Sequence, residues 1–128
     1  MKSSLFSKQK KKILLIDDEE ELVSSLSEVL EENGYKVIIA TNGMEAIKKA
    51  KEERPDLILL DIMMPKMDGY EVLRQLKTSA EAWAIPVIMV TARSDSGSIL
   101  KTQDSRAADY IIKPFDVSEV LSSIQRYI

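Results

Sequence analysis

The chain has 128 residues and a mass of 14.4 kDa, which predicts one domain with enough buried surface to fold without disulfides or a structural metal. It contains no cysteine and no histidine. These absences exclude disulfides, thiolate catalysis, zinc ribbons, imidazole metal sites and Ser-His-Asp triads.

Charge is divided unevenly between a short leader and the rest of the chain. Residues 1–12 hold five lysines and no acidic residue, which leaves 13 basic and 21 acidic residues in the remainder. We expect residues 1–11 to form a flexible basic tail, with binding to anionic partners as the alternative. The acidic remainder argues against direct nucleic-acid binding. The next apolar run is only four residues long before DDEEE, too short for a signal peptide or membrane span. We therefore expect a cytoplasmic protein without membrane association.

Five short apolar runs alternate with stretches of helical period along the chain. The predicted strands are, in order, Ile13–Ile16, Lys36–Ala40, Leu57–Leu60, Val87–Val90 and Tyr110–Ile112. Continuous branched runs such as the first are typical of strands buried on both faces. The alternation predicts a parallel sheet with right-handed crossovers and helices on both faces.

The helices of the first half have recognisable ends. The first follows the acidic run and ends at Asn33-Gly34, where glycine permits a left-handed stop. The second is capped by Asn42, carries Met44, Ile47 and Ala50 on one side, and ends before Pro55.

Three further helices are predicted in the second half. One follows the loop at residues 63–69, and the last begins at Asp116 and Glu119, which have capping-box spacing. Between them, residues 94–105 are rich in serine and contain Gly97, which predicts a weak fourth helix. The expected fold is a flavodoxin-like three-layer α/β/α domain, with a doubly wound sheet of order 2-1-3-4-5 and five helices.

Side chains of chemical interest follow four of the strands, at the point where each ends. They are Asp17, Asp18, Asp61, Thr91 and Lys113. Ligands bind at the carboxyl ends of such strands, so we expect the three carboxylates to share one crevice, with Thr91 and Lys113 on its opposite rim. Two like charges 4 Å apart cost on the order of 4 kcal/mol at an effective dielectric of 20. Such a cluster needs either raised pKa values or a cation. With only oxygen donors available, the cation is expected to be hard, and Mg²⁺ fits best.

A carboxylate beside Mg²⁺ and a lysine can attack phosphorus and form an aspartyl phosphate. Taken alone, each residue has a plainer interpretation. The acidic run can complement a helix N-terminus, Thr91 can be a turn residue and Lys113 a surface charge. Tyr110 can be a core residue, and the loop methionines can fill gaps. They are Met63, Met64 and Met67. The prediction of a site depends on these residues meeting at one edge of the sheet.

Four segments also resemble a known family. In order they are ILLIDDEEE, DLILLDIMMPKMDGYEVLRQLK, PVIMVTAR and ADYIIKPF. They resemble the receiver domain of bacterial two-component response regulators, with a chemotaxis-regulator-like fold, over residues 12–128. The resemblance implies a phosphorylation-activated signalling switch rather than an enzyme. It implies that Asp61 is the phosphoacceptor and is phosphorylated by a histidine kinase or a histidine phosphotransfer protein.

The resemblance also assigns roles around Asp61. It implies that Mg²⁺ is held by Asp17, Asp18, Asp61 and the Met63 backbone carbonyl. It implies Thr91 as switch hydroxyl, Tyr110 as rotating aromatic and Lys113 as the cation that pairs with the phosphoryl group. A cis bond before Pro114 is expected too. Phosphorylation would change the face formed by the fourth and fifth strands and the fourth and fifth helices. Dimerisation through the fourth strand and the fifth helix is a further expectation.

Two departures and three alternatives accompany this interpretation. Arg106 stands where the family usually has glycine, which puts the fourth helix and its output face in doubt. The resemblance also links Met63 and Arg93, which flank the site, to the lifetime of the phosphoryl group. One alternative is a pseudo-receiver that is not phosphorylated and acts as an interaction module. Another is a haloacid dehalogenase-like phosphohydrolase, which needs an acid where Met63 stands. The third alternative is a flavin mononucleotide carrier, but this chain lacks the Ser/Thr/Gly-rich phosphate loop that such a carrier needs after its first strand. The downstream target and any effector domain stay open.

Overall fold

The computed structural model describes residues 10–64, 68–92 and 106–128. The strands are β1 (Lys12–Ile16), β2 (Lys36–Ala40), β3 (Leu57–Asp61), β4 (Val87–Ala92) and β5 (Asp109–Lys113). The helices are α1 (Glu20–Glu32), α2 (Gly43–Glu53), α3 (Gly69–Lys77) and α5 (Val117–Tyr127). The fourth helix predicted within 94–105 lies outside the described residues, which contain four helices.

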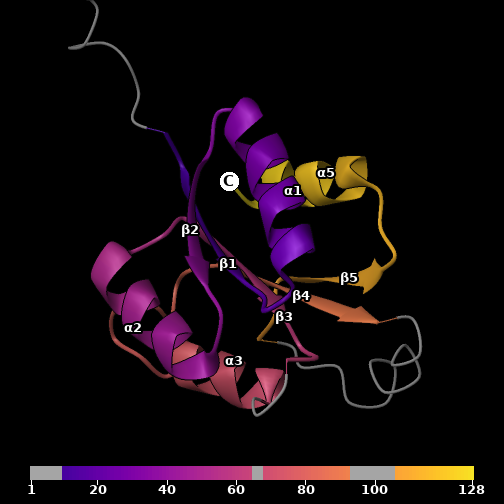
Figure 1. Cartoon of the computed structure of the whole chain (residues 1–128). Coiled ribbons are helices and arrows are strands. Elements are labelled where there is room, and N and C mark those ends of the chain that lie inside the picture. The colour runs from indigo at the N-terminus through magenta and orange to yellow at the C-terminus, as the bar shows by residue number, and fades with distance from the viewer. Residues whose placement is uncertain (1–9, 65–67, 93–105) are drawn as a thin grey trace, which may run out of the picture.

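All five strands are parallel and form one sheet of order β2-β1-β3-β4-β5, as predicted. Helices α1 and α5 cover one face of this sheet, and α2 and α3 cover the other (Figure 1). The chain reverses its direction of winding between β1 and β3, so a crevice opens at the carboxyl ends of these two strands. No helix in the described ranges is long and apolar enough to span a membrane.

Two apolar layers hold the sheet between its helices. Successive side chains of a strand point to opposite faces, so Ile13 and Leu15 pack toward α1 and α5, while Leu14 and Ile16 pack toward α2 and α3. All residues of β3 are buried. Asp61 is the last of them, which means that a carboxylate ends the most central strand.

The ends of the helices mostly follow the sequence signals. The Asn42 side chain accepts a hydrogen bond from the Glu45 amide at 2.9 Å, and Gly34 has a φ of 91° after α1. The Glu119 carboxylate accepts from the Asp116 amide at 3.2 Å, which forms one arm of the predicted capping box. Arg54 ends α2 in the left-handed region with a φ of 47°, although no glycine or asparagine marks this stop.

The predicted inner side of α2 is wrong at Met44, whose side chain is 87% exposed. The helix instead buries Ala46 and Ala50, with Ile47 partly buried beside them. Two alanines bring the helix close to the sheet, and Met44 in the first turn then points away from it. The small side chains rather than the largest apolar one therefore set the orientation of this helix.

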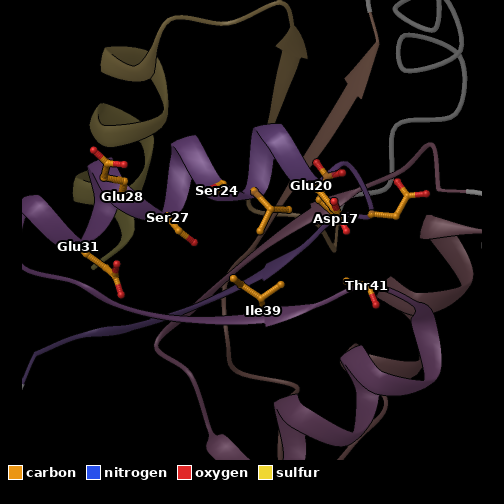
Figure 2. A pocket seen from close by; sticks show the side chains of 10 residues that line it. Asp17, Glu20, Ser24, Ser27, Glu28, Glu31, Ile39 and Thr41 are labelled. Carbon is orange, nitrogen blue, oxygen red and sulfur yellow. The ribbon is translucent and has the colours of Figure 1, made fainter.

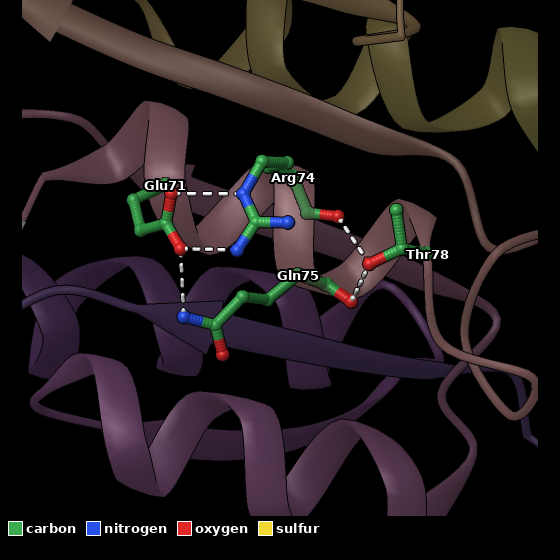
Figure 3. Close-up of polar contacts among 4 residues, drawn as sticks. All are labelled: Glu71, Arg74, Gln75 and Thr78. Carbon is green, nitrogen blue, oxygen red and sulfur yellow. Dashed lines mark hydrogen bonds and ion pairs between the residues drawn. The ribbon is translucent and has the colours of Figure 1, made fainter.

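Polar contacts on the surface of α3 fix its exposed face (Figure 3). The Glu71 carboxylate accepts hydrogen bonds from Arg74 at 2.9 and 2.6 Å and from Gln75 at 3.0 Å. The hydrogen bonds from Arg74 and then Gln75 lower the pKa of Glu71 to about 2. At the end of the helix, the Thr78 hydroxyl donates to the backbone oxygen of Arg74 at 2.9 Å.

Candidate functional site

The carboxyl ends of β1 and β3 bring two carboxylates together. These strands are hydrogen-bonded neighbours, with Ile16 level with Leu60. The residues that follow this pair are Asp17 and Asp61, which are only 3% and 4% exposed. Asp18, which comes next in the chain, is exposed. The topology alone therefore places these three acidic side chains at one point of the sheet edge.

One carboxylate oxygen from each of Asp17, Asp18 and Asp61 lies within 4.8 Å of the other two. The backbone fixes the two buried groups in the same way. Asp17 accepts a hydrogen bond from the Glu19 amide at 2.9 Å, and Asp61 accepts one from the Met63 amide at 3.1 Å. Each carboxylate is thus held by the amide two residues later and keeps free lone pairs. We call these three side chains the acidic pocket.

Lys113, at the end of β5, supplies the positive charge that faces this pocket. Its Nζ lies 3.6 Å from carboxylate oxygens of Asp17, Asp61 and Glu19. Burial alone would lower the pKa of Lys113, but the attraction of Asp61, Asp17 and Glu19 outweighs it, and the pKa is raised. Lys113 therefore stays protonated, as the predicted role on the rim requires. The peptide bond to Pro114 is cis, as the resemblance implied.

The acidic pocket is electrostatically incomplete without a cation. Burial, first, and repulsion by Asp61 raise the pKa of Asp17, although the hydrogen bond from the Glu19 amide and the charge of Lys113 oppose this shift. One lysine shared among several carboxylates does not neutralise them. The net charge of the pocket therefore stays negative and favours the binding of a further cation.

Thr91 and Tyr110 share one face of the sheet beside the pocket. Tyr110 is level with Met89 on the neighbouring strand, and residues 89 and 91 point to the same face because their spacing is two. The Thr91 side chain is fully buried, and its hydroxyl has no hydrogen-bond partner among the described residues. Tyr110 is partly buried and packs against the core that lies under α2 and α3. Both predicted switch residues thus lie on one side of β4 and β5.

Sequence reasoning missed Glu19 and misjudged part of the loop after β3. Glu19 was only one member of an acidic run, yet its carboxylate pairs with Lys113. The sequence signal was its place directly after two pocket residues. Among the loop methionines, Met64 is buried and fills a gap as expected, whereas the Met63 side chain is 56% exposed. Met67 and Arg93 lie outside the described residues.

The donor set of the pocket fits a hard divalent cation. Only oxygen ligands are available there, because the chain has neither histidine nor cysteine. Oxygen atoms on one Mg²⁺ lie about 3 to 4 Å apart, given bonds of about 2.1 Å. The spacing of up to 4.8 Å between the carboxylate oxygens closes to this range with small side-chain movements. The residues that would hold the ion are those of the acidic pocket.

Comparisons with known proteins agree with this geometry. Residues 13–125 match the family model described as the response regulator receiver domain. The chain is 44% identical over 104 residues to the alkaline phosphatase synthesis transcriptional regulatory protein PhoP of Bacillus subtilis. That match covers 81% of this chain but 42% of PhoP, so the chain spans less than half the length of this relative.

Solved structures show the same fold. The chemotaxis response regulator CheY4 of Vibrio cholerae is 30% identical, with a TM-score of 0.83, and the match covers 93% of this chain and 99% of that one. The receiver domain of sensor histidine kinase PA1611 from Pseudomonas aeruginosa is 29% identical, with a TM-score of 0.81, and the match covers 92% and 97%. That structure has a magnesium ion coordinated in its active-site cleft. With its sheet order, acidic pocket and family match, this chain belongs to the response regulator receiver domain family, whose members are phosphoacceptor regulatory domains rather than enzymes.

Proposed function

We propose that this chain is a signalling switch in which Asp61 accepts a phosphoryl group in the presence of Mg²⁺. One observation carries this proposal. The buried Asp61 carboxylate lies within 4.8 Å of Asp17 and Asp18 and 3.6 Å from Lys113, at the strand crossover where such folds bind ligands. This arrangement has a nucleophile, a place for a cation and a fixed positive charge.

The chemistry follows from these groups. A carboxylate oxygen of Asp61 attacks phosphorus, and the bond from phosphorus to the donor histidine nitrogen breaks as the new bond forms. The nitrogen leaves with the bonding electrons and takes up a proton. Lys113 then pairs with phosphoryl oxygens instead of with the bare carboxylate. Mg²⁺, when bound, supplies the remaining positive charge.

We propose Thr91 as the residue that senses the phosphoryl group. Its buried hydroxyl lacks a partner among the described residues and can donate a hydrogen bond to a phosphoryl oxygen once the side chain moves inward. Tyr110 shares the same face of the sheet and would fill the space that Thr91 vacates. The phosphoryl group then favours the inward arrangement because it binds that arrangement better.

The partner proposed as donor is a histidine kinase or a histidine phosphotransfer protein, because a receiver domain without histidine needs a phosphohistidine from elsewhere. We further propose that Met63 supplies a backbone carbonyl to Mg²⁺, since its amide already binds Asp61. The cytoplasmic location, dimerisation through β4 and α5, and the separation of a tail at residues 1–11 from a domain at 12–128 stay predictions.

Intact mass spectrometry tests the proposal directly. The chain is incubated with a small acyl phosphate, with and without Mg²⁺, beside the variants Asp61→Asn and Asp116→Asn. Asp116 is exposed and outside the pocket, and asparagine serves equally well at its helix N-cap. We expect one added phosphoryl group in the parent and in Asp116→Asn, only with Mg²⁺, and none in Asp61→Asn. No addition to the parent, with Mg²⁺ binding shown by calorimetry, would favour the pseudo-receiver.

A further inference from the structure

A groove of about 530 Å³ lies between α1 and β2, beside the acidic pocket (Figure 2). The apolar side chains of Val23 and Ile39 form part of its lining. Acidic side chains stand along it from one end of α1 to the other. They are Asp17, Asp18, Glu20, Glu28 and Glu31. The groove therefore combines apolar and acidic side chains.

Several polar groups of this groove have no partner among the described residues. Within the described ranges, Glu20, Glu28 and Glu31 take part in no ion pair. Ser27 points from α1 toward β2 in Figure 2, and its hydroxyl oxygen is almost wholly shielded from solvent without a hydrogen-bond partner. A buried polar group without a partner costs free energy. An occupant of the groove could therefore supply positive charge to these glutamates and a hydrogen-bond partner to the Ser27 hydroxyl.

The N-terminal segment of the same chain has the complementary chemistry. Before β1 begins at Lys12 it reads MKSSLFSKQKK, with four lysines, no acidic residue and one apolar pair, Leu5-Phe6. The Lys36 amide donates to the Lys11 backbone oxygen at 2.9 Å, so this segment leaves the sheet beside the beginning of β2. The Tyr35 amide bonds to the Leu30 oxygen, which places the Glu31 end of the groove at the same edge.

We propose that the groove between α1 and β2 binds this lysine-rich N-terminal segment of the same chain. The apolar pair covers Val23 and Ile39, and the lysines lie against Glu28, Glu31 and Glu20. Nine extended residues reach about 30 Å, whereas the helix from Glu20 to Glu31 is about 17 Å long. The tether is short, so its effective concentration is on the order of millimolar and modest contacts suffice.

Docking there would change the electrostatics of the neighbouring pocket. Asp17 and Asp18 line both the groove and the acidic pocket. A lysine held at the Glu20 end of the groove lies within a Debye length of these carboxylates, about 10 Å at 0.1 M salt, whereas one held at Glu31 lies farther away. The segment would thus act as a built-in source of positive charge at the edge of the site, whether or not the pocket is phosphorylated.

Paramagnetic relaxation in the full chain tests this proposal without Mg²⁺ or phosphate. A nitroxide is attached at Ser4→Cys, which is unique because the chain has no cysteine. We expect broadening of the Ser24, Ser27 and Ile39 amide signals relative to the reduced label. The broadening should fall when salt rises from about 0.1 to about 1 M, which shortens the Debye length to about 3 Å.

Charge-reversal variants make the test specific. Glu28→Lys with Glu31→Lys should lower the ratio of docked to undocked segment about tenfold, since two attractions become repulsions. Glu21→Lys with Glu52→Lys changes the net charge equally at exposed positions outside the groove and should leave the broadening intact. Absence of broadening, or equal broadening in both variants, would overturn the proposal. Broadening of an untagged, isotope-labelled chain by tagged copies would overturn it in favour of a second copy.

Discussion

Replacing Asp17 with asparagine removes one charge from the acidic pocket and keeps both the side-chain shape and an oxygen for the Glu19 amide. At an effective dielectric of about 20, Lys113 at 3.6 Å attracts Asp17 by about 4.6 kcal/mol. A carboxylate at the 4.8 Å upper limit of the spacing in this cluster repels it by about 3.5 kcal/mol. Repulsion from buried Asp61 and, more weakly, from exposed Asp18 therefore roughly cancels this attraction.

Burial then decides whether Asp17→Asn stabilises or destabilises the folded protein. Asp17 is 3% exposed, and desolvation is the largest contribution to its raised pKa. The asparagine variant avoids this desolvation and loses only the extra strength of a hydrogen bond to a charged acceptor. Without Mg²⁺ at neutral pH, we expect Asp17→Asn to raise the free energy of unfolding by about 1–2 kcal/mol, the usual scale for relieving an incompletely compensated buried polar group. With a urea m-value of about 2 kcal/mol/M, the midpoint rises by about 0.5–1 M.

The pH dependence has a definite sign. Because the folded pKa of Asp17 lies above its ordinary value of 3.8, the folded state binds this proton more tightly than the unfolded state does. The penalty is full above the folded pKa and disappears as pH falls below 3.8. The stability difference between variant and parent should therefore vanish on acidification through this window. Glu52→Gln, which removes an exposed charge from α2, is the matched control and should change little.

Mg²⁺ should reverse the order of stability. An ion that binds only the folded parent adds about 2.7 kcal/mol at one hundred times its Kd, and Asp17→Asn removes one of its carboxylate ligands. Urea unfolding with and without Mg²⁺ measures both effects. A variant that is less stable than the parent without Mg²⁺, or whose advantage persists well below pH 3.8, would refute the reasoning.

Three other substitutions test separate features. Lys113→Met leaves the pocket carboxylates without their cation and should cost about 1–3 kcal/mol in urea unfolding without Mg²⁺; an unchanged midpoint would contradict this. Gly69→Ala would place a methyl group 2.8 Å from the Ile62 Cα atom and should cost about 1–3 kcal/mol, whereas a neutral effect would show that α3 can shift. Arg74→Met removes the main cause of the low Glu71 pKa, so a nuclear magnetic resonance titration should find that pKa well above 2; a value still near 2 would rule out Arg74 as the cause.

The sheet and the pocket were accessible from sequence because both follow from short-range patterns. Branched apolar runs mark each strand, and the residue after each run lies at the same edge once the strands are parallel. Asp17, Asp61 and Lys113 meet for this reason alone. Bounds shifted by a residue or two, since β3 and β4 continue through Asp61 and Thr91.

Features that depend on packing were less accessible. Met44 and Ala46 both fit an apolar helical face, and only the closeness of α2 to the sheet decides that the alanine is buried. Glu19 pairs with Lys113 across the crevice. The two residues follow or end different strands, so no local sequence pattern encodes this contact. The left-handed Arg54 lacks the usual glycine because Pro55 already ends the helix.

Thr91 is the residue for which sequence and structure diverge most usefully. A threonine that ends a strand usually bonds to a nearby backbone group, yet its hydroxyl is fully buried and unpaired among the described residues. Such a group costs about 1–3 kcal/mol, which a phosphoryl oxygen would recover. Thr91→Val should therefore raise the free energy of unfolding by about 1 kcal/mol, while Thr91→Ser should not. If valine instead destabilises the protein in urea unfolding, the hydroxyl already has a partner in the unphosphorylated state, and Thr91 is not held ready for a phosphoryl group.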